Sequence, residues 1–234
     1  MEAPFPPSTI RPARLSLDPV IALLDYDSGN IRSVEKALRK AGAEVVRART
    51  PGAMAGARGI VLPGVGAFDD CVHAMERQGL LEAIRSWIAA DRPFLGICVG
   101  YQALFERSEE FNSHARGLGV FGGPVVRFQP TAEMPRLKIP QIGWNQIDLR
   151  QPHCPLYRGI PGGSWFYFVH SYHPRPTDPG IVATETTYGT TFASSVWRGN
   201  TFATQFHPEK SQENGLRLLS NFVELAEAVD ARSR

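Results

Sequence analysis

Short apolar runs alternate with segments of helical periodicity in the first half of the chain, and this alternation constrains the fold most strongly. The first run, VIALLDY from Val20, is continuously apolar at its start, as in strands that are buried on both faces. The segment GNIRSVEKALRKAG follows, with four apolar residues at helical spacing and Gly42 where a helix C-cap belongs. This order predicts an α/β fold in which helices cover a parallel sheet.

The alternation continues as far as residue 98. It predicts strands over 43–48, 59–64 and 93–98, and helices over 68–78 and 80–90. In the second of these helices we expect Leu81, Ile84 and Ile88 on the buried face. Because the chemistry of parallel α/β sheets gathers at the carboxyl ends of the strands, we expect a functional site where the fourth predicted strand, 93–98, ends.

Beyond residue 120 the predicted strands follow one another more closely. Glycine, proline and asparagine turns separate them, which indicates hairpins, antiparallel pairing and hence a mixed sheet. The predicted strands cover 124–128, 144–149, 164–170, 180–186, 191–197 and 200–207. A final helix is predicted from Gln212 to Val229, with a buried stripe of Leu216, Leu219, Val223 and Ala226.

Length and composition narrow the classes of protein. A chain of 234 residues suits one large domain, predicted over 19–234 after a flexible, proline-rich extension over 1–18. The 25 basic and 23 acidic residues are interspersed, which argues against a nucleic-acid or anionic-membrane surface and favours a small substrate. Three cysteines without C-x-x-C spacing argue against a disulfide framework or a cysteine-rich zinc site. With no secretory signal and no membrane-length apolar run, we expect a cytoplasmic protein.

The segment GICVGYQ, residues 96–102, places Cys98 where a strand is predicted to meet a helix. A nucleophile at such a sharp turn needs small neighbours, and Gly96 and Gly100 provide them. The amino end of the following helix would stabilise a thiolate. However, the same pattern equally suits a buried cysteine in a glycine-rich turn, so the decision depends on partner residues.

The segment HPE, residues 207–209, offers such partners. Pro208 favours an extended backbone at His207, and residues two apart in an extended chain project to the same side. Glu209 is therefore placed to hold the imidazole, which would give a Cys-His-Glu triad with Cys98. An isolated HPE would more simply be a surface turn, and it is the combination with Cys98 that favours a catalytic base.

A thiol that attacks a carbonyl also needs donors for the oxyanion that forms. The N–H of Val99, next to the nucleophile, is one candidate. The second is the loop LPGVGAF, residues 62–68, where Gly64 and Gly66 allow a peptide to reorient. On its own, P-G-x-G indicates a turn and nothing more.

Together these three segments resemble the class I, triad-type glutamine amidotransferases. Five stretches resemble more specifically the glutaminase subunits of imidazole glycerol phosphate synthase: DYDSGNIRSVEKAL (25–38), LPGVGAF (62–68), IGWNQI (142–147), FVHSYH (168–173) and QFHPEKSQ (205–212). The resemblance runs from about residue 20 to the C-terminus and implies a three-layer, flavodoxin-like domain with a mixed, mostly parallel sheet. Val99 and Tyr101 stand where leucine and methionine are common in the family, but neither change removes a chemical group from the mechanism.

The resemblance implies a role for each of these residues. Cys98 would attack the side-chain amide of glutamine, His207 would protonate the leaving ammonia and activate water, and Glu209 would hold His207. The oxyanion of the γ-glutamyl thioester would be bound by the N–H of Val99 and by a flipped peptide at Gly64 to Val65. No cofactor or metal is implied.

The residues expected to bind glutamine by this resemblance are Gln102, Glu110, Ser171 and Tyr172. From the residues alone these assignments stay open: Glu106 competes with Glu110 for the substrate ammonium, and Tyr172 also fits a packed aromatic. His170 and His173 suggest a metal site, but no third ligand lies at suitable spacing.

The resemblance also implies a partner. The family's glutaminase docks on a (β/α)8-barrel cyclase subunit as a heterodimer, and ammonia passes through the barrel to a ribonucleotide substrate. The products are imidazole glycerol phosphate and aminoimidazole carboxamide ribonucleotide (AICAR), in histidine biosynthesis. Two alternatives are a class I glutaminase of vitamin B6 or purine synthesis, and a non-catalytic binding subunit on the same scaffold.

Overall fold

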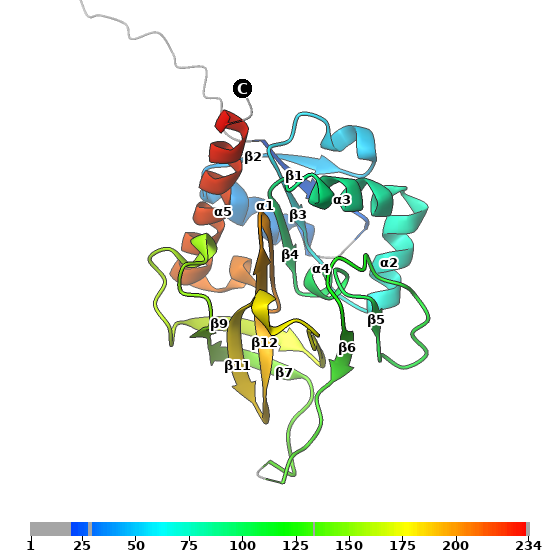
Figure 1. Ribbon diagram of the computed structural model, residues 1–234, viewed down its shortest axis with the longest axis vertical. Helices are drawn as coiled ribbons and strands as arrows, with labels where there is room; N and C mark the ends of the chain where they lie inside the picture. The colour runs from blue at the N-terminus through cyan, green and yellow to red at the C-terminus, as the bar shows by residue number, and fades with distance from the viewer. Residues whose placement is uncertain (1–19, 28–29, 133, 233–234) are drawn as a thin grey trace, which may run out of the picture.

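The computed structural model describes residues 20–27, 30–132 and 134–232. The extension predicted over 1–18 lies outside the described residues. Figure 1 shows a central sheet with helices at its sides and smaller sheets beyond one end of its strands. The central sheet has eight strands, in the order β2-β1-β3-β4-β13-β12-β11-β8.

The first five of these strands are parallel, and they carry the candidate site. They are β2 (Glu44–Ala48), β1 (Val20–Leu24), β3 (Gly59–Leu62), β4 (Phe94–Ile97) and β13 (Thr201–Thr204). Every residue of β3, β4 and β13 is buried, because helices cover both faces of the sheet. The strand order is the flavodoxin-like order that the resemblance implied, which confirms the predicted fold class.

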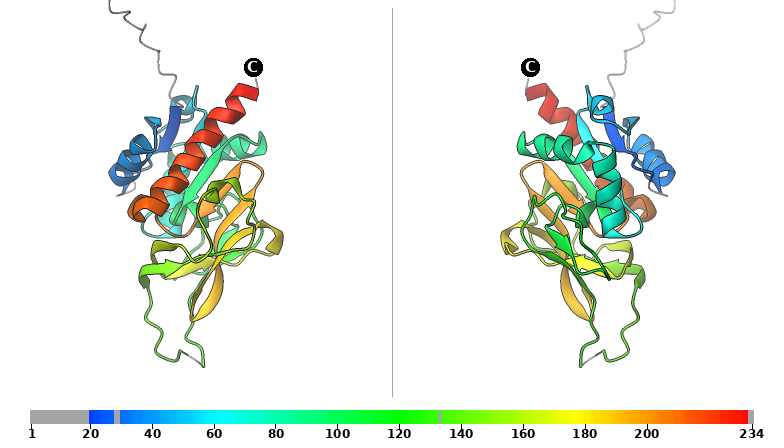
Figure 2. Two further views of the ribbon diagram at one scale, coloured as in Figure 1. Left: turned by 90° about the vertical axis from the view of Figure 1, so that its left-hand side faces the viewer. Right: turned by 90° about the vertical axis from the view of Figure 1, so that its right-hand side faces the viewer.

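Helices cover both faces of the sheet, which confirms the three predicted layers (Figure 2). On one face α1 (Ile31–Lys40) packs against α5 (Gln212–Arg232), and on the other α2 (Phe68–Arg77) packs against α3 (Leu80–Ala89). Gly42 follows α1 with φ +97°, as expected for a glycine just past a helix end. Among the described residues, no helix is long and apolar enough to cross a membrane.

Two predicted buried faces were partly wrong. In α3 the buried residues are Leu80, Ile84 and Trp87, while Leu81 and Ile88 are only partly buried. The face is rotated because Trp87 turns inward, where its indole N–H donates to the Pro93 carbonyl at 3.0 Å. In α5, Leu218 and Phe222 are buried together with the predicted Leu219, Val223 and Ala226, whereas Leu216 lies at the margin. The sheet and α1 together cover a wider stripe of this helix than its periodicity indicated.

The other part of the central sheet is antiparallel. β12 (Thr190–Arg198) pairs with β13 on one side and with β11 (Val182–Tyr188) on the other, and β8 (Asp148–Leu149) closes the edge. This confirms the predicted hairpins and the mixed sheet.

Three of the predicted strands, however, lie wholly or partly outside the central sheet. β6 (Pro124–Arg127) pairs with β5 (Arg107–Ser108) and β10 (Tyr172–Pro174), while β7 (Gln141–Gln146) pairs with β9 (Trp165–His170). Alternation along a strand indicates which face is buried but not which strand lies beside it. Four short 3-10 turns complete the described structure: Pro51–Met54, Pro155–Tyr157, Pro179–Ile181 and Pro208–Lys210.

Candidate active site

The chain makes a sharp turn at Cys98, directly after β4. Cys98 has φ +56° and ψ −109°, a conformation that residues with a side chain rarely adopt. Strain of this kind persists only where the surrounding structure enforces it, and it is concentrated at functional sites. Cys98 itself is 4% exposed.

The helix after this turn, α4 (Val99–Gln102), has only four residues, so it is shorter than the sequence reasoning assumed. The carbonyls of Ala103 and Leu104 accept hydrogen bonds from the N–H groups of Leu118 and Val120. These carbonyls are therefore bonded outside the helix, which ends before them. A large helix dipole is therefore not available at Cys98, and the local N–H groups carry whatever stabilisation the backbone provides.

Glycines allow this turn to pack closely on the sheet. A Cβ atom at Gly100 would collide with the carbonyl of Leu62 in β3, and one at Gly96 would lie 2.7 Å from the Gly100 oxygen. Gly64 packs on the same turn, since a Cβ there would lie 2.6 Å from the Gly100 nitrogen. The loop 63–66 is fixed from the other side by Tyr26, whose hydroxyl donates to the Pro63 carbonyl at 2.7 Å.

His207 and Glu209 lie together after β13. His207 has an extended backbone (φ −98°, ψ +98°), and its Nδ1 lies 2.8 Å from Glu209 Oε1. Both side chains are almost fully buried, at 1% and 0% exposed. Asn30 reaches the same carboxylate from the start of α1, and its Nδ2 donates to Glu209 Oε1 at 2.6 Å. Glu209 therefore fixes the imidazole, and Asn30 in turn fixes Glu209.

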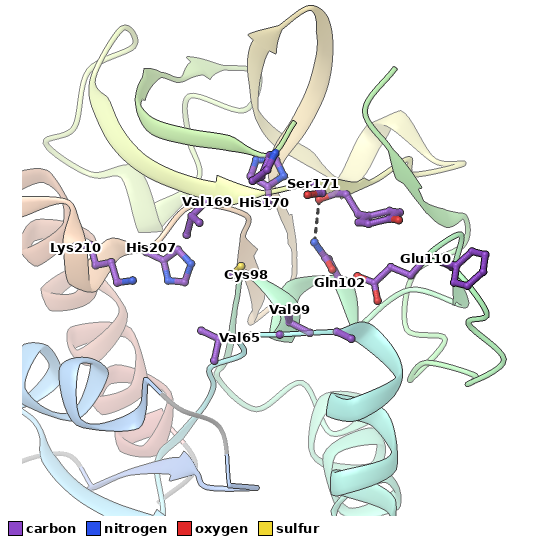
Figure 3. A pocket seen from close by; sticks show the side chains of 15 residues that line it. Val65, Cys98, Val99, Gln102, Glu110, Val169, His170, Ser171, His207 and Lys210 are labelled. Carbon is purple, nitrogen blue, oxygen red and sulfur yellow. Dashed lines mark hydrogen bonds between the residues drawn. The ribbon is translucent and has the colours of Figure 1, made fainter. Parts of the chain in front are cut away.

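The remaining ring nitrogen of His207 faces the cysteine. Nε2 is buried without a hydrogen-bond partner among the described residues, and Figure 3 shows the ring beside the Cys98 sulfur. Burial lowers the pKa of His207, but the negative charges of a Cys98 thiolate and of Glu209 outweigh it and raise the pKa to about 10. The site thus favours the protonated, positively charged form of His207 at neutral pH.

A cavity of about 650 Å³ opens in front of these residues. Among the sequence-predicted site residues, the structure brings the following to its wall: Val65, Cys98, Val99, Gln102, Glu110, Ser171, Tyr172 and His207. The other two, Gly64 and Glu209, are not part of the wall: Gly64 packs on the turn, and Glu209 holds His207.

The structure distinguishes Glu110 from its competitor Glu106. Glu110 lines the cavity, and its Oε2 accepts a hydrogen bond from the Phe68 N–H at 2.8 Å. Burial raises the pKa of Glu110, and the charges of two aspartates in α2 add to the effect. Glu106 instead accepts from the Gly123 N–H at 3.0 Å, and its side chain is 49% exposed. Glu110 is therefore the carboxylate that can meet a ligand in the cavity.

Several residues of the site were not singled out from the sequence. Asn30 orients Glu209, Gln205 contacts the Cys98 sulfur, and Lys210 lines the cavity, as does His170, which the sequence suggested only as a metal ligand. Each lies inside a stretch quoted for the family resemblance, but no spacing rule indicates its role. Burial lowers the pKa of His170 to about 3, so the ring is neutral. Within the described ranges, no group of three or more His, Cys, Asp or Glu side chains is arranged to hold a metal ion.

Comparisons with known proteins agree with this geometry. The family model for class-I glutamine amidotransferases matches residues 22–225. The imidazole glycerol phosphate synthase subunit HisH of Synechococcus sp. (strain JA-3-3Ab) is 51% identical over 87% of this chain and 93% of its own. The HisH subunit of Syntrophotalea carbinolica is 47% identical over 88% of this chain and 100% of its own.

Solved structures share the fold at lower identity. A crystal structure of a glutamine amidotransferase superimposes with a TM-score of 0.68 at 20% identity, covering 88% of this chain and 98% of that one. The structure of PurLQS from Thermotoga maritima gives 0.69 at 17% identity, covering 89% and 99%. Fold, family model and relatives agree, and the chain belongs to the class I glutamine amidotransferases, within the family of HisH subunits of imidazole glycerol phosphate synthase.

Proposed function

We propose that the chain hydrolyses glutamine to glutamate and ammonia at the Cys98 cavity, and that it delivers the ammonia to a (β/α)8-barrel cyclase subunit. The observation that carries the proposal is the arrangement of Cys98 at a strained turn facing His207, whose other nitrogen is held by Glu209. This is the arrangement that thiol nucleophiles require: a base within reach of the sulfur and a third group that orients the base.

In the first half-reaction the Cys98 thiolate attacks the side-chain amide carbon of glutamine. The N–H of Val99 and a flipped peptide at Gly64 to Val65 stabilise the oxyanion of the tetrahedral intermediate. The C–N bond then breaks, and the amine leaves as ammonia with the proton that His207 Nε2 supplies. The product on the enzyme is a γ-glutamyl thioester.

In the second half-reaction water replaces the amine. His207, now neutral, removes a proton from a water molecule as the oxygen attacks the thioester carbon. The C–S bond breaks, glutamate leaves, and the cysteine returns as a thiolate next to an imidazolium. During both steps Gln102, Glu110, Ser171 and Tyr172 bind the amino acid end of the substrate from the opposite part of the cavity wall.

An exposed apolar surface beside the cavity supports docking of the cyclase. Trp144 and Trp165 on the β7–β9 sheet are 43% and 51% exposed, and Ile142 is 64% exposed. Ile142 pairs across the two strands with Val169, which lines the cavity. A partner on this surface would bury an apolar patch and cover the cavity mouth. Excluding water matters, because ammonia that becomes protonated is no longer a nucleophile.

The relatives are named as subunits of imidazole glycerol phosphate synthase. We therefore infer that the complex is a heterodimer that makes imidazole glycerol phosphate and AICAR in histidine biosynthesis. The buried Cys71, Cys98 and Cys154 are free thiols, which supports a reducing, cytoplasmic compartment.

The test is Cys98→Ala in the reconstituted heterodimer, assayed once with glutamine and once with ammonium salt. Glutamine-dependent synthesis is expected to disappear, while ammonia-dependent synthesis continues because the cyclase is intact. Persistent synthesis from glutamine would show that Cys98 is not the nucleophile.

Docking is tested separately with Trp144→Ala and Trp165→Ala. Each variant should co-purify with less cyclase than the wild-type chain and unfold at an unchanged temperature, because the side chain it removes is exposed. Val46→Ala is the control, since Val46 is 38% exposed on β2, outside both the β7–β9 sheet and the cavity wall. Undiminished co-purification of both tryptophan variants would place the interface elsewhere.

A further inference from the structure

The Cys98 sulfur has a second polar neighbour, which belongs to neither the triad nor the oxyanion loop. Gln205 follows β13, two residues before His207, and its side chain is fully buried. Its Nε2 donates to Cys98 Sγ at 3.7 Å, a hydrogen-bond length suited to the large sulfur atom. Figure 3 shows the sulfur between the His207 ring on one side and the Gln102 side chain on the other.

The orientation of the Gln205 amide is fixed by a chain of hydrogen bonds. The carbonyl of Tyr172 can only accept, so the amide nitrogen of Gln102 must face it, at 3.0 Å. The same nitrogen donates its second hydrogen to Gln205 Oε1 at 3.2 Å. With its oxygen engaged in this way, Gln205 turns its own nitrogen toward the Cys98 sulfur.

The Tyr172 carbonyl, where this series of hydrogen bonds begins, is itself held in place. His170 Nδ1 lies 2.8 Å from the Tyr172 carbonyl, which therefore accepts from both His170 and Gln102. The backbone of Gln205 is also fixed, because its N–H donates to the Ser194 carbonyl at 2.8 Å. Every group that sets the direction of the Gln205 amide is thus held by a second contact.

We propose that Gln205 is a hydrogen-bond donor to the Cys98 thiolate, kept in its donating orientation by Gln102. An N–H donor stabilises a charged acceptor more than a neutral one, so the contact favours the reactive form of the sulfur and fixes its direction. The contribution to glutamine hydrolysis rests on the function proposed above, whereas the contact with the sulfur does not.

A consequence concerns Gln102 in the cavity wall. Because both hydrogens of its amide nitrogen are used by Tyr172 and Gln205, Gln102 presents its oxygen to a ligand. A ligand that donates a hydrogen bond to this oxygen binds the same Gln102 amide that orients Gln205. The residue that contacts the substrate is thereby connected to the nucleophile through a single intervening side chain.

The test is the alkylation of Cys98 by iodoacetamide in the full-length chain, followed by mass spectrometry of the peptide that contains Cys98 across a pH series. Gln205→Met keeps the approximate volume and removes the donor. Alkylation is expected to be about tenfold slower at neutral pH and to reach half its maximal rate at a higher pH, since the thiolate reacts and the thiol does not. A packing role alone would lower the unfolding temperature and leave this pH profile unchanged.

Asn221→Leu is the matched control, because Asn221 carries a buried amide, 1% exposed, whose nitrogen donates to the Leu156 and Arg158 carbonyls outside the cavity wall. Its alkylation rate should equal that of the wild type. If Gln205→Met does not fold, Gln102→Leu replaces it, since losing the hydrogen bond to Gln205 Oε1 frees the amide to rotate. This variant should react about threefold more slowly. A wild-type rate and pH profile in the folded variant would overturn the proposal.

Glutamine kinetics separate this proposal from the proposed function. With glutamine as substrate, Gln205→Met should lower kcat more than it raises KM, because Gln205 contacts the sulfur and is not itself one of the residues that line the cavity. If alkylation slows as expected but the wild-type complex does not hydrolyse glutamine, the proposed function fails and the role of Gln205 toward Cys98 stands.

Discussion

The two walls that meet at Cys98 are built by different means. The elbow side, residues 62–66 and 96–102, follows β3 and β4, and its shape depends on glycines that let one backbone segment lie on another. The base side, residues 205–211, follows β13, and its shape depends on side-chain hydrogen bonds. The packing of the elbow side holds the strained backbone of Cys98 in place, whereas the hydrogen bonds of the base side fix the orientation of the His207 ring.

The partners of the base side come from distant parts of the chain. Asn30 at the start of α1 holds Glu209, and Gln102 on α4 holds Gln205. Ser211 links the segment to β9, because its hydroxyl donates to the His207 carbonyl at 2.6 Å and accepts from the Tyr167 N–H at 3.0 Å. We therefore expect the elbow side to respond mainly to changes in volume, and the base side to changes in hydrogen bonding and pH.

The largest expected effect is steric and concerns Gly100. In Gly100→Ala the new methyl group would collide with the Leu62 carbonyl, which is backbone and cannot move aside without disturbing β3. The free energy of unfolding should fall by about 3 kcal/mol or more, measured by urea denaturation.

Gly66→Ala is the control within the same side. Gly66 has φ +91°, but no atom lies within 4 Å of an added Cβ, so only the backbone strain of about 1 kcal/mol is expected. Equal losses in the two variants would show that conformational strain, and not close packing, shapes the elbow side.

The next effect is a loss of stability in acid, caused by two buried histidines: His170 in the cavity wall and His173 in β10. Burial lowers the pKa of His170 to about 3 and that of His173 to about 4. Below the usual histidine pKa of about 6.5 the unfolded chain binds these two protons and the folded chain does not. Stability should therefore fall with decreasing pH, by up to about 1.4 kcal/mol per pH unit for each histidine.

His207 does not add to this loss, because its raised pKa keeps it protonated in both states below pH 6.5. Replacing one histidine by a residue without a charge, as in His173→Gln, should roughly halve the slope of unfolding free energy against pH about one unit below 6.5, where the unfolded His207 is also protonated. An unchanged slope would mean that these rings are protonated in the folded protein.

A smaller effect is expected at Asn30. Asn30→Ala removes the 2.6 Å hydrogen bond to Glu209, so the carboxylate holds His207 less firmly. We expect kcat/KM for glutamine to fall by about tenfold, as for one hydrogen bond to a charged group, with little change in KM. Asn200→Ala provides the control, since Asn200 donates to the Asp91 carboxylate at 3.0 Å, just before β13 begins and outside the cavity wall. Comparable activity of both variants would show that the hydrogen bond from Asn30 does not help to orient His207.

The two sides of the site also differ in how far the sequence could predict them. The glycines around Cys98 and in the loop 62–68 indicate close backbone packing from the sequence alone. The elbow could therefore be predicted without knowing which residues pack against it. The pairing of His207 with Glu209 was accessible for a similar reason, because Pro208 sets the intervening backbone. Asn30 and Gln205 have no such local pattern, since their roles follow from contacts across more than a hundred residues.

The same distinction applies to the fold. Continuous apolar runs predicted the parallel strands because burial on both faces is visible in the run itself. β7 pairs with β9 in a sheet separate from the central one. The alternation of apolar and polar residues along a strand does not indicate which strand lies beside it, so this pairing could not be predicted. Trp87 was missed on the buried face of α3 because its inward turn depends on the Pro93 carbonyl beyond the helix end.

The central claim is that Cys98 forms a covalent thioester with the γ-glutamyl group of the substrate, and that a water molecule activated by His207 then hydrolyses this thioester. The direct measurement is acid quenching of the complex during turnover of glutamine, followed by mass spectrometry of the peptide over residues 93–106. A γ-glutamyl group is expected on Cys98 of the wild-type chain and should be absent from the same peptide of Cys98→Ala. Production of glutamate with no such adduct, or an adduct on a different residue, would contradict the central claim.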